Sequence, residues 1–232
     1  MSHFESTNEV NVKGNIMSLV FGDNYKNQLS LQDRPYCFCF LFNNSASSFL
    51  KIISAKNLSI PATTLSNGCY RDMFEGCTSL RIAPSLLPAT TLSAYCYNNM
   101  FISCTSLTTP PSLPATVLAN SCYYYMFGGC TSLKTIPELP ATTLADYCYS
   151  YMFIGCTSLT TPPSLLPATT LANYCYSYMF QNCTSLTKAP ELPAVTLASN
   201  CYVNMFYGCT SLKEAPELPA VTLASSCYSY MF

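Results

Sequence analysis

The fold is decided by the stretch Leu192-Pro-Ala-Val-Thr-Leu-Ala-Ser-Asn-Cys-Tyr-Val-Asn-Met-Phe-Tyr-Gly-Cys-Thr-Ser-Leu-Lys-Glu-Ala-Pro-Glu217, because close copies of it fill most of the 232-residue chain. Its Met-Phe pair recurs at steps of 27, 26, 26, 27, 26 and 26 residues, starting at Met73, Met100, Met126, Met152, Met179, Met205 and Met231. Both longer steps contain one extra leucine before a proline, which indicates a loop there. Self-similarity at such a period is the signature of a solenoid.

The first half of the repeat predicts a helix. Leu197, Cys201 and Met205 fall four residues apart and form an apolar stripe at helical spacing. The threonine before Leu197 suits a helix N-terminus, where its hydroxyl can accept from a free backbone N–H. Gly208 follows Met-Phe where the helix should stop, because glycine adopts the left-handed cap conformation readily. The same column holds Gly76, Ser103, Gly129, Gly155 and Asn182 in other copies.

The second half of the repeat predicts a short strand with a turn. In one copy, the apolar residues of this segment are Leu133, Ile136 and Leu139. Pro137 limits the length of the strand, because proline has no backbone N–H to donate to a strand ladder. Stacked strands lie about 4.8 Å apart, whereas helix axes need roughly 8–10 Å. We therefore expect an α/β repeat solenoid that forms a curved, right-handed arc of about seven coils. Each coil would have its short strand on the concave side and its helix on the convex side.

The chain divides into two regions. Residues 1–57 do not fit the repeat, and we expect them to form an N-terminal cap with strands at Val10–Val12 and Ile16–Phe21. Residues 58–232 form the predicted solenoid. We expect it to be truncated in mid-repeat, because the sequence stops directly after a Met-Phe pair and shows no polar terminal cap.

Composition excludes several classes of function. Half of the residues are hydrophobic and 9% are charged, which favours a packed core over disorder. The formal net charge is −1 and no Lys/Arg cluster occurs, which argues against nucleic-acid binding. No run approaches the roughly 18 apolar residues of a membrane-spanning helix, so we expect no membrane insertion. The first residues show no basic segment followed by an apolar one, so no secretory signal is visible.

Catalytic groups are scarce, and we expect no enzymatic activity. His3 is the single histidine, which disfavours a Ser-His-Asp or Cys-His arrangement, and no phosphate-binding loop occurs. Most of the fifteen cysteines fall into two columns, eight residues apart within a copy and without Cys-x-x-Cys spacing. We therefore expect a ladder of buried thiols, with a few inter-coil disulfides as the alternative, and no metal or cofactor site. The columns are Cys69, Cys96, Cys122, Cys148, Cys175, Cys201 and Cys227, and Cys77, Cys104, Cys130, Cys156, Cys183 and Cys209.

Two sets of side chains are candidates for a binding surface. The first lies in the variable strand columns, on or near the predicted concave face, where solenoid partners often dock. Its members are Ile82, Thr109, Thr135, Thr161, Lys188 and Glu214 in one column, and Glu138, Glu191 and Glu217 in another. The second set consists of tyrosines that stacked coils would align into ladders: Tyr95, Tyr124, Tyr125, Tyr147, Tyr151, Tyr174, Tyr178 and Tyr230. An ordinary polar face and packing between neighbouring helices are the respective alternatives.

The string Met-Phe-x-Gly-Cys-Thr-Ser-Leu, followed by Leu-Pro-Ala-Thr-Thr-Leu-Ala-x-x-Cys-Tyr, resembles the BspA-type leucine-rich repeats of bacterial surface proteins, including those of gut bacteria. The resemblance covers nearly the whole chain and implies a leucine-rich-repeat arc outside the cell or at a bacterial surface. It also implies adhesion or protein–protein recognition, with a protein or a glycan as ligand. A structural spacer or stalk without a ligand of its own, a phage-particle component and a cytoplasmic location remain the alternatives.

Overall fold

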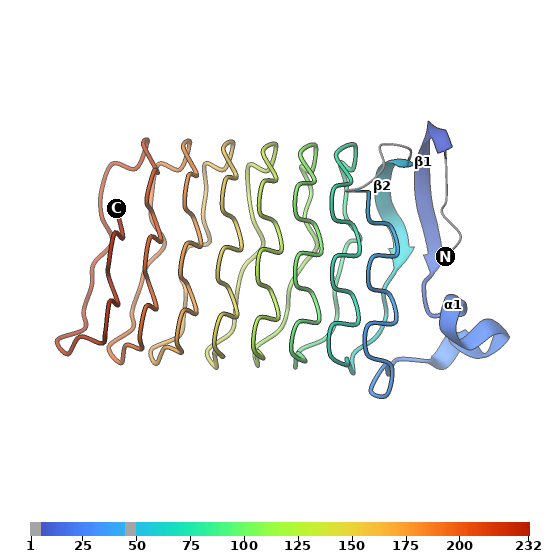
Figure 1. Ribbon diagram of the computed structural model, residues 1–232, viewed down its shortest axis with the longest axis horizontal. Coiled ribbons are helices and arrows are strands. Elements are labelled where there is room, and N and C mark those ends of the chain that lie inside the picture. The colour runs from blue at the N-terminus through green and yellow to red at the C-terminus, as the bar shows by residue number, and fades with distance from the viewer. Residues whose placement is uncertain (1–5, 45–49) are drawn as a thin grey trace.

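The computed structural model describes residues 6–44 and 50–232. Figure 1 shows a single stack of coils that follow one another along the long axis of the molecule. The regular elements in these residues all lie near the N-terminus: β1 Ser6–Asn15, α1 Ser18–Phe21, the 3₁₀ helix η1 Gly22–Asn27 and β2 Leu50–Ser59. The repetitive stacked architecture that the sequence predicts is present, but its coils are built from turns.

The prediction of one helix per coil was wrong, because a run of turns occupies that segment in every described coil. Backbone φ is positive at every fourth residue of the run. In one coil these residues are Tyr147 (58°), Tyr151 (59°) and Gly155 (68°). An α-helix keeps φ near −63° throughout, so it cannot contain such residues. A positive φ at the third residue is the feature of a type II turn, which fits a succession of tight turns.

Backbone amides along this run alternate between two kinds of acceptor. The amides of Ser150 and Met152 donate to carbonyls three residues earlier, over 3.3 and 3.2 Å. Between them, the amide of Tyr151 donates to the carbonyl of Ser177 in the next coil, over 2.9 Å. An α-helix would instead direct every amide to the carbonyl four residues earlier within the same segment. We call this alternating arrangement the turn ladder, and it recurs from coil to coil.

The spacing of the apolar residues distinguishes the turn ladder from a helix. Two successive turns make a unit of four residues, so side chains four apart face the same way; Cys201, Met205 and Cys209 are all buried. An α-helix advances about 100° per residue, so each step of four would rotate the side chain by a further 40° or so. The strict interval of four is therefore typical of the turn ladder, although over a short window it resembles helical periodicity.

The other half of each coil is extended and is joined to its neighbours by isolated parallel bridges. Ile82 pairs with Thr109, Leu86 pairs with Ser112, and Thr91 pairs with Val117. Both halves of a coil are thus held to the next coil by backbone hydrogen bonds. The difference in spacing between helices and strands, which predicted a curved arc, is consequently absent, and the coils in Figure 1 follow a nearly straight line.

The N-terminal region contains one further rung of the turn ladder. Phe38 donates its amide proton to the carbonyl of Cys69 over 2.9 Å, and φ is positive at Tyr36 and Phe40. This rung lies within the residues 1–57 that the sequence assigns to a cap. Its pattern, Cys-Phe-Cys-Phe-Leu-Phe, keeps the inward aromatic and aliphatic positions of the repeat but lacks Met-Phe, so sequence comparison missed it.

Strands β1 and β2 pair in parallel beside this rung. β2 also joins the first full coil, since the amide of Ala55 donates to the carbonyl of Ile82 over 2.8 Å. The predicted strand at Val10–Val12 is confirmed as part of β1. The predicted strand at Ile16–Phe21 was wrong: the amides of Val20 and Phe21 donate to the nearby carbonyl of Met17, and α1 forms there. Among the described residues no helix has the length and apolarity needed to cross a membrane.

Columns of stacked aromatic side chains run through the interior of the stack. Successive rings in two columns have centroids 5.1–5.8 Å apart and planes within 24° of parallel. One column is Phe38, Tyr70, Tyr97, Tyr123, Tyr149, Tyr176, Tyr202 and Tyr228. The other is Phe42, Phe74, Phe101, Phe127, Phe153, Phe180, Phe206 and Phe232. Stacking buries in each coil a face that a single coil could not cover alone.

The substitution Asn204→Ala separates the turn ladder from a helix. Asn204 has a φ of 52°, a conformation that is strained for any residue with a Cβ. Asparagine tolerates it because its short polar side chain can hydrogen-bond locally, and alanine cannot do this. We expect a loss of about 1 kcal/mol in the free energy of unfolding, measured by chemical denaturation. Asn204→Gly, the matched control, should leave stability nearly unchanged. A helix would reverse the order, because alanine is the best helix former and glycine among the worst.

Candidate binding surfaces

The predicted strand columns lie in the extended half of the coils, and the structure brings several members together. Ile82 pairs with Thr109 and Thr135 pairs with Thr161, so these residues form a line along the stack. Ile82 is half-buried, whereas the three threonines are exposed. The charged members of the two columns are also exposed: Lys188, Glu214, Glu138, Glu191 and Glu217.

Lys188 and Glu214 share a shallow hollow with Lys213. The hollow has a volume of about 300 Å³, and its remaining walls come from small side chains and Pro216. Charges of both signs therefore line one edge of the stack near its C-terminal end. Threonine hydroxyls elsewhere in this half of the coil bond to the backbone; Thr108 Oγ1, for example, donates to the carbonyl of Arg81 over 3.1 Å. Such hydroxyls are already engaged within the protein.

A second candidate surface is formed by tyrosines on the outer side of the turn ladder. The rings of Tyr125 and Tyr151 stack with centroids 4.4 Å apart, and those of Tyr151 and Tyr178 stack at 4.3 Å, both pairs within 6° of parallel. Tyr124 packs its ring edge-on against Tyr125 at 4.9 Å. Burial and neighbouring tyrosines raise the pKa of Tyr151. We call Tyr124, Tyr125, Tyr151 and Tyr178 the tyrosine face.

The sequence predicted tyrosine ladders, and the structure confirms them for part of the set. Tyr147 and Tyr174 stack at 4.7 Å, beside the tyrosine face. Tyr95 and Tyr230 are exposed, and the neighbouring coil places Ser121 or Asn204 in the corresponding column. The register of the turns decides which tyrosines meet, because a ladder needs the same residue at the same turn position in adjacent coils. These rings project from turns and not, as predicted, from a helix.

The thirteen cysteines of the two columns are buried, as the sequence predicts, and all fifteen cysteines are free thiols. Those before Thr-Ser-Leu share one role. The Sγ atom of Cys156 donates to the carbonyl oxygen of Phe127 in the preceding coil over 3.2 Å, and Cys130 donates in the same way to Phe101. Burial raises the pKa of Cys77 from about 9 to about 12. The thiols are therefore protonated at neutral pH, and the thiolate needed for nucleophilic attack or metal binding is scarce.

Groups that could support chemistry are sparse on both surfaces. Among residues 6–44 and 50–232, no cluster of three or more His, Cys, Asp or Glu side chains is placed to hold a metal ion. His3 lies outside the described residues. One surface presents tyrosine rings and hydroxyls, and the other presents threonines with a few charges.

Stability should fall at alkaline pH. Above pH 9 the thiols of the unfolded chain lose protons, while buried thiols such as Cys77 and Cys209, with pKa values raised to about 12 and about 11, retain theirs. The unfolded state then binds fewer protons, so the free energy of unfolding decreases as pH rises. We expect Tm, followed by circular dichroism, to be flat from pH 7 to 8.5 and to decline steadily to pH 11. Cys77→Ser should make the decline shallower, and a Tm independent of pH across this range would contradict the protonated thiol ladder.

No protein-family model, no curated protein and no solved structure matches this chain. The resemblance to BspA-type repeats thus stays a prediction from the sequence.

Proposed function

We propose that the chain is a non-catalytic binding module and that the tyrosine face is its recognition surface. The observation that carries the proposal is the stack of Tyr125, Tyr151 and Tyr178 on the outside of the coils, with successive centroids 4.4 and 4.3 Å apart. These rings are half-buried, so they combine apolar contact area with hydroxyls that reach the surface. Tyrosine is enriched at protein interfaces for this combination.

Variation between coils supports a recognition role. The inward positions repeat the same residue types, whereas the turn column of Tyr151 holds Asn99 and Asn204 in other coils, and a buried Asp72 in the first full coil. The neighbouring turn column contains Gly68, Tyr95, Tyr147, Tyr174, Asn200 and Ser226, together with a buried Ser121. Tyrosine, serine, asparagine and glycine also dominate antibody loops, where tyrosine supplies large contacts and the small residues supply adaptable hydrogen bonds. A constant interior with a variable exterior fits a scaffold that presents a binding surface.

The tyrosine face is also organised before any partner arrives. Each stacked ring is held by its neighbour in an adjacent coil, and the backbone beneath it is held by an amide such as that of Tyr151, which donates to the carbonyl of Ser177. Little side-chain freedom remains to be lost on binding, and such preorganisation increases affinity for a given contact area. The strand columns are the second candidate face, because their charged members Lys188 and Glu214 line one hollow.

The resemblance to BspA-type leucine-rich repeats supports a place outside the cell or on a bacterial surface and a protein or glycan as ligand. Within that family the turn ladder would take the position that a helix or extended segment holds in other leucine-rich repeats, and the coils would wind right-handedly. Adhesion is the corresponding biological role.

A structural spacer, or a component of a phage particle, is the second candidate. Its support is the continuity of the stack: the turn ladder joins each coil to the next, and parallel bridges join the extended halves of the coils as far as Thr196. Such a rod would resist bending and could hold another domain at a distance. The spacer role needs no tyrosines on the surface, so the two candidates differ in what their removal would do.

The test compares two variants of the chain by biosensor and glycan array, against fibronectin, collagen and mucin. The first is Tyr151→Asn with Tyr178→Asn, since asparagine occupies the same turn position at Asn99 and Asn204 and should preserve the backbone. The second, Lys188→Glu with Glu214→Lys, alters the strand columns alone. We expect saturable binding by the unmodified chain, at least tenfold weaker for the tyrosine variant, which corresponds to about 1.4 kcal/mol.

Two other results would contradict recognition by the tyrosine face. Binding lost only in the Lys188→Glu, Glu214→Lys variant would move recognition to the strand columns. Binding to none of the probes, with both variants folded by circular dichroism, would favour the spacer.

A further inference from the structure

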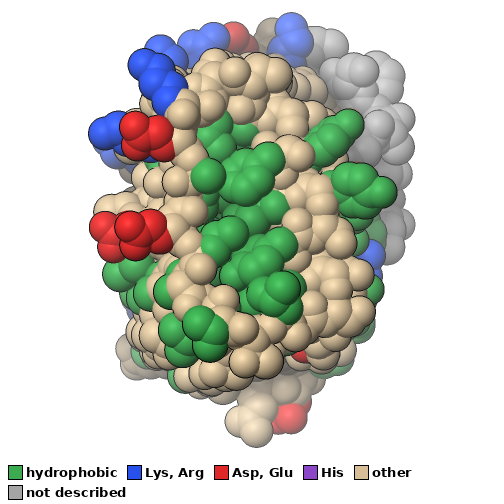
Figure 2. All heavy atoms as spheres, turned by 90° about the vertical axis from the view of Figure 1, so that its left-hand side faces the viewer, with side chains coloured by type: hydrophobic (Ala, Val, Ile, Leu, Met, Phe, Trp, Pro, Cys, Tyr) green, Lys and Arg blue, Asp and Glu red, His purple; other side chains and the backbone are tan. Residues whose placement is uncertain are grey.

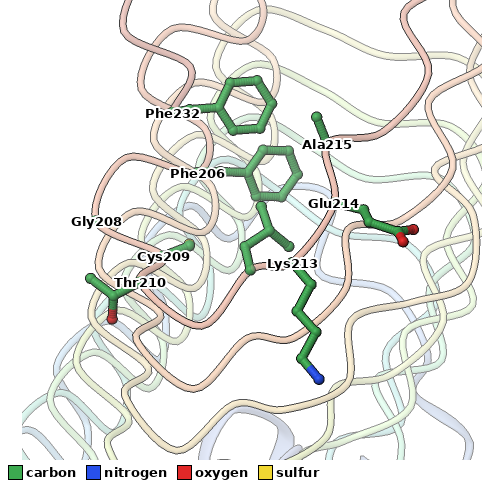
Figure 3. Close-up of a pocket in the computed structure, with 9 residues that line it drawn as sticks. Phe206, Gly208, Cys209, Thr210, Lys213, Glu214, Ala215 and Phe232 are labelled. Atoms are coloured by element: carbon green, nitrogen blue, oxygen red, sulfur yellow. The ribbon is translucent and has the colours of Figure 1, made fainter.

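Aromatic rings are stacked more closely on the outside of the molecule than inside it. Viewed along the stack in Figure 2, hydrophobic side chains fill the centre of the coil. Rings in the two interior columns have centroids 5.1–5.8 Å apart, and Figure 3 shows one such pair, Phe206 and Phe232, one above the other. On the tyrosine face, the ring of Tyr151 lies only 4.4 Å from that of Tyr125 and 4.3 Å from that of Tyr178, measured between centroids.

These outer rings also point the same way, so that equivalent atoms face each other. Tyr125, Tyr151 and Tyr178 occupy the same turn position, with φ of 54°, 59° and 58°, and their ring planes lie within 6° of parallel. Burial, the neighbouring tyrosines and a side-chain hydrogen bond with Tyr178 raise the pKa of Tyr151. Since that hydrogen bond holds two hydroxyls together, the ring carbons beside these hydroxyls also lie next to each other.

Two phenols held in this way can be coupled by oxidation. Loss of one electron and one proton from each tyrosine gives two phenoxyl radicals, whose unpaired electrons are shared with the ring carbons beside the oxygen. One such carbon from each ring forms the new carbon–carbon bond, and the hydrogen on each bonded carbon moves to its oxygen, which restores both phenols. With hydrogen peroxide as the oxidant, two tyrosines and one peroxide give one dityrosine and two water molecules.

Tyrosines of the interior column are poorly placed for the same reaction. Tyr149 and Tyr176 are each 1% exposed, and their centroids are 5.7 Å apart. Their hydroxyls have no hydrogen-bond partner among the described residues, and burial raises the pKa of both well above the usual range. A proton released on oxidation would have no acceptor there, whereas the hydroxyl of Tyr151 has Tyr178 beside it and lies at the surface.

The thiols of the chain are weak competitors for peroxide. Peroxide oxidises thiolates, and the susceptibility of a cysteine follows its thiolate character and its exposure. The cysteines of the two columns are buried, and burial raises the pKa of Cys37 and of Cys39 to about 11. The thiols therefore stay protonated at neutral pH and consume little oxidant before tyrosine reacts.

We propose that the tyrosine face is an oxidative cross-linking site, at which a haem peroxidase with hydrogen peroxide joins Tyr151 to its stacked neighbour Tyr125 or Tyr178. Reactants held in contact need no encounter through solution, which favours coupling within one chain over coupling between chains. The half-buried rings can tilt toward each other without disturbing the interior. The bond would fasten adjacent coils covalently. It requires neighbouring phenols and no ligand, so it does not rest on the proposed binding role.

The experiment treats the dilute, folded 232-residue chain with a haem peroxidase and hydrogen peroxide. The thiols are then reduced and alkylated, and trypsin cleaves after Arg81, Lys134 and Lys188. We expect monomeric protein with dityrosine fluorescence. A Tyr125–Tyr151 bond joins peptide 82–134 to peptide 135–188 with the loss of two hydrogen atoms, and a Tyr151–Tyr178 bond removes two hydrogen atoms from peptide 135–188 alone. Fragment-ion mass spectrometry assigns the linked residues.

Tyr151→Phe is the decisive variant, because it removes the phenol common to both pairs and keeps a ring that can stack. Phe40, with a φ of 58°, shows that phenylalanine fits a turn of this conformation. We expect the yield of both products to fall about tenfold or more, because the remaining tyrosines of the face lose their oriented partner. Tyr147→Phe is the matched control: it alters the separate Tyr147–Tyr174 stack and should leave both products unchanged.

Three results would overturn the proposal. The first is dityrosine confined to covalent dimers of the chain. The second is an equal yield of the two products in Tyr151→Phe. The third is no dityrosine in the chain under conditions in which free tyrosine couples in the same reaction. Circular dichroism of each variant before oxidation establishes that the coils are intact, and the outcome is independent of whether the tyrosine face binds a protein or a glycan.

Discussion

The structure depends on one constraint: every second backbone amide of the turn run needs a hydrogen-bond acceptor in the next coil. Along the turn ladder, alternate amides such as those of Ser150 and Met152 are satisfied locally, three residues back, while Tyr151 donates to the next coil. Buried backbone groups left without partners are costly, so this division explains how coils built from turns can still enclose an apolar interior. It also requires a positive φ at every fourth residue, which explains why Gly155 recurs as Gly129 and Gly208 and is elsewhere replaced by Asn182 or Ser103.

The side-chain ladders follow from this backbone. Adjacent coils have the same backbone path and are joined directly by backbone hydrogen bonds. Each inward aromatic residue therefore lies against the equivalent residue of the next coil, and rings such as Phe127 and Phe153 stack within 2° of parallel. The same repetition gives each cysteine before Thr-Ser-Leu a carbonyl to which its thiol donates. These thiols act as small buried donors, and that role accounts for a high cysteine content among described residues that show no disulfide and no cluster placed to hold a metal ion.

The proposed recognition role rests on positions that the backbone does not constrain. The inward positions are constrained by packing, but outward turn positions tolerate tyrosine, asparagine, serine and glycine, and three adjacent coils place tyrosine there at Tyr125, Tyr151 and Tyr178. At the N-terminal end of the stack, the rung around Phe38 covers the ladder of the first full coil.

The sequence by itself determined the period, the stacking, the burial of the cysteine columns and the alignment of tyrosines, because identical residues at a fixed interval must superimpose in any stacked fold. It did not distinguish a helix from the turn ladder, since an apolar interval of four suits both over one short segment, and it missed the rung at Tyr36 to Asn44 because that rung lacks Met-Phe. Only the tertiary structure decided those points. An amide finds its acceptor in another coil, 26 or 27 residues away, and propensities within one repeat carry no information about a partner in the next.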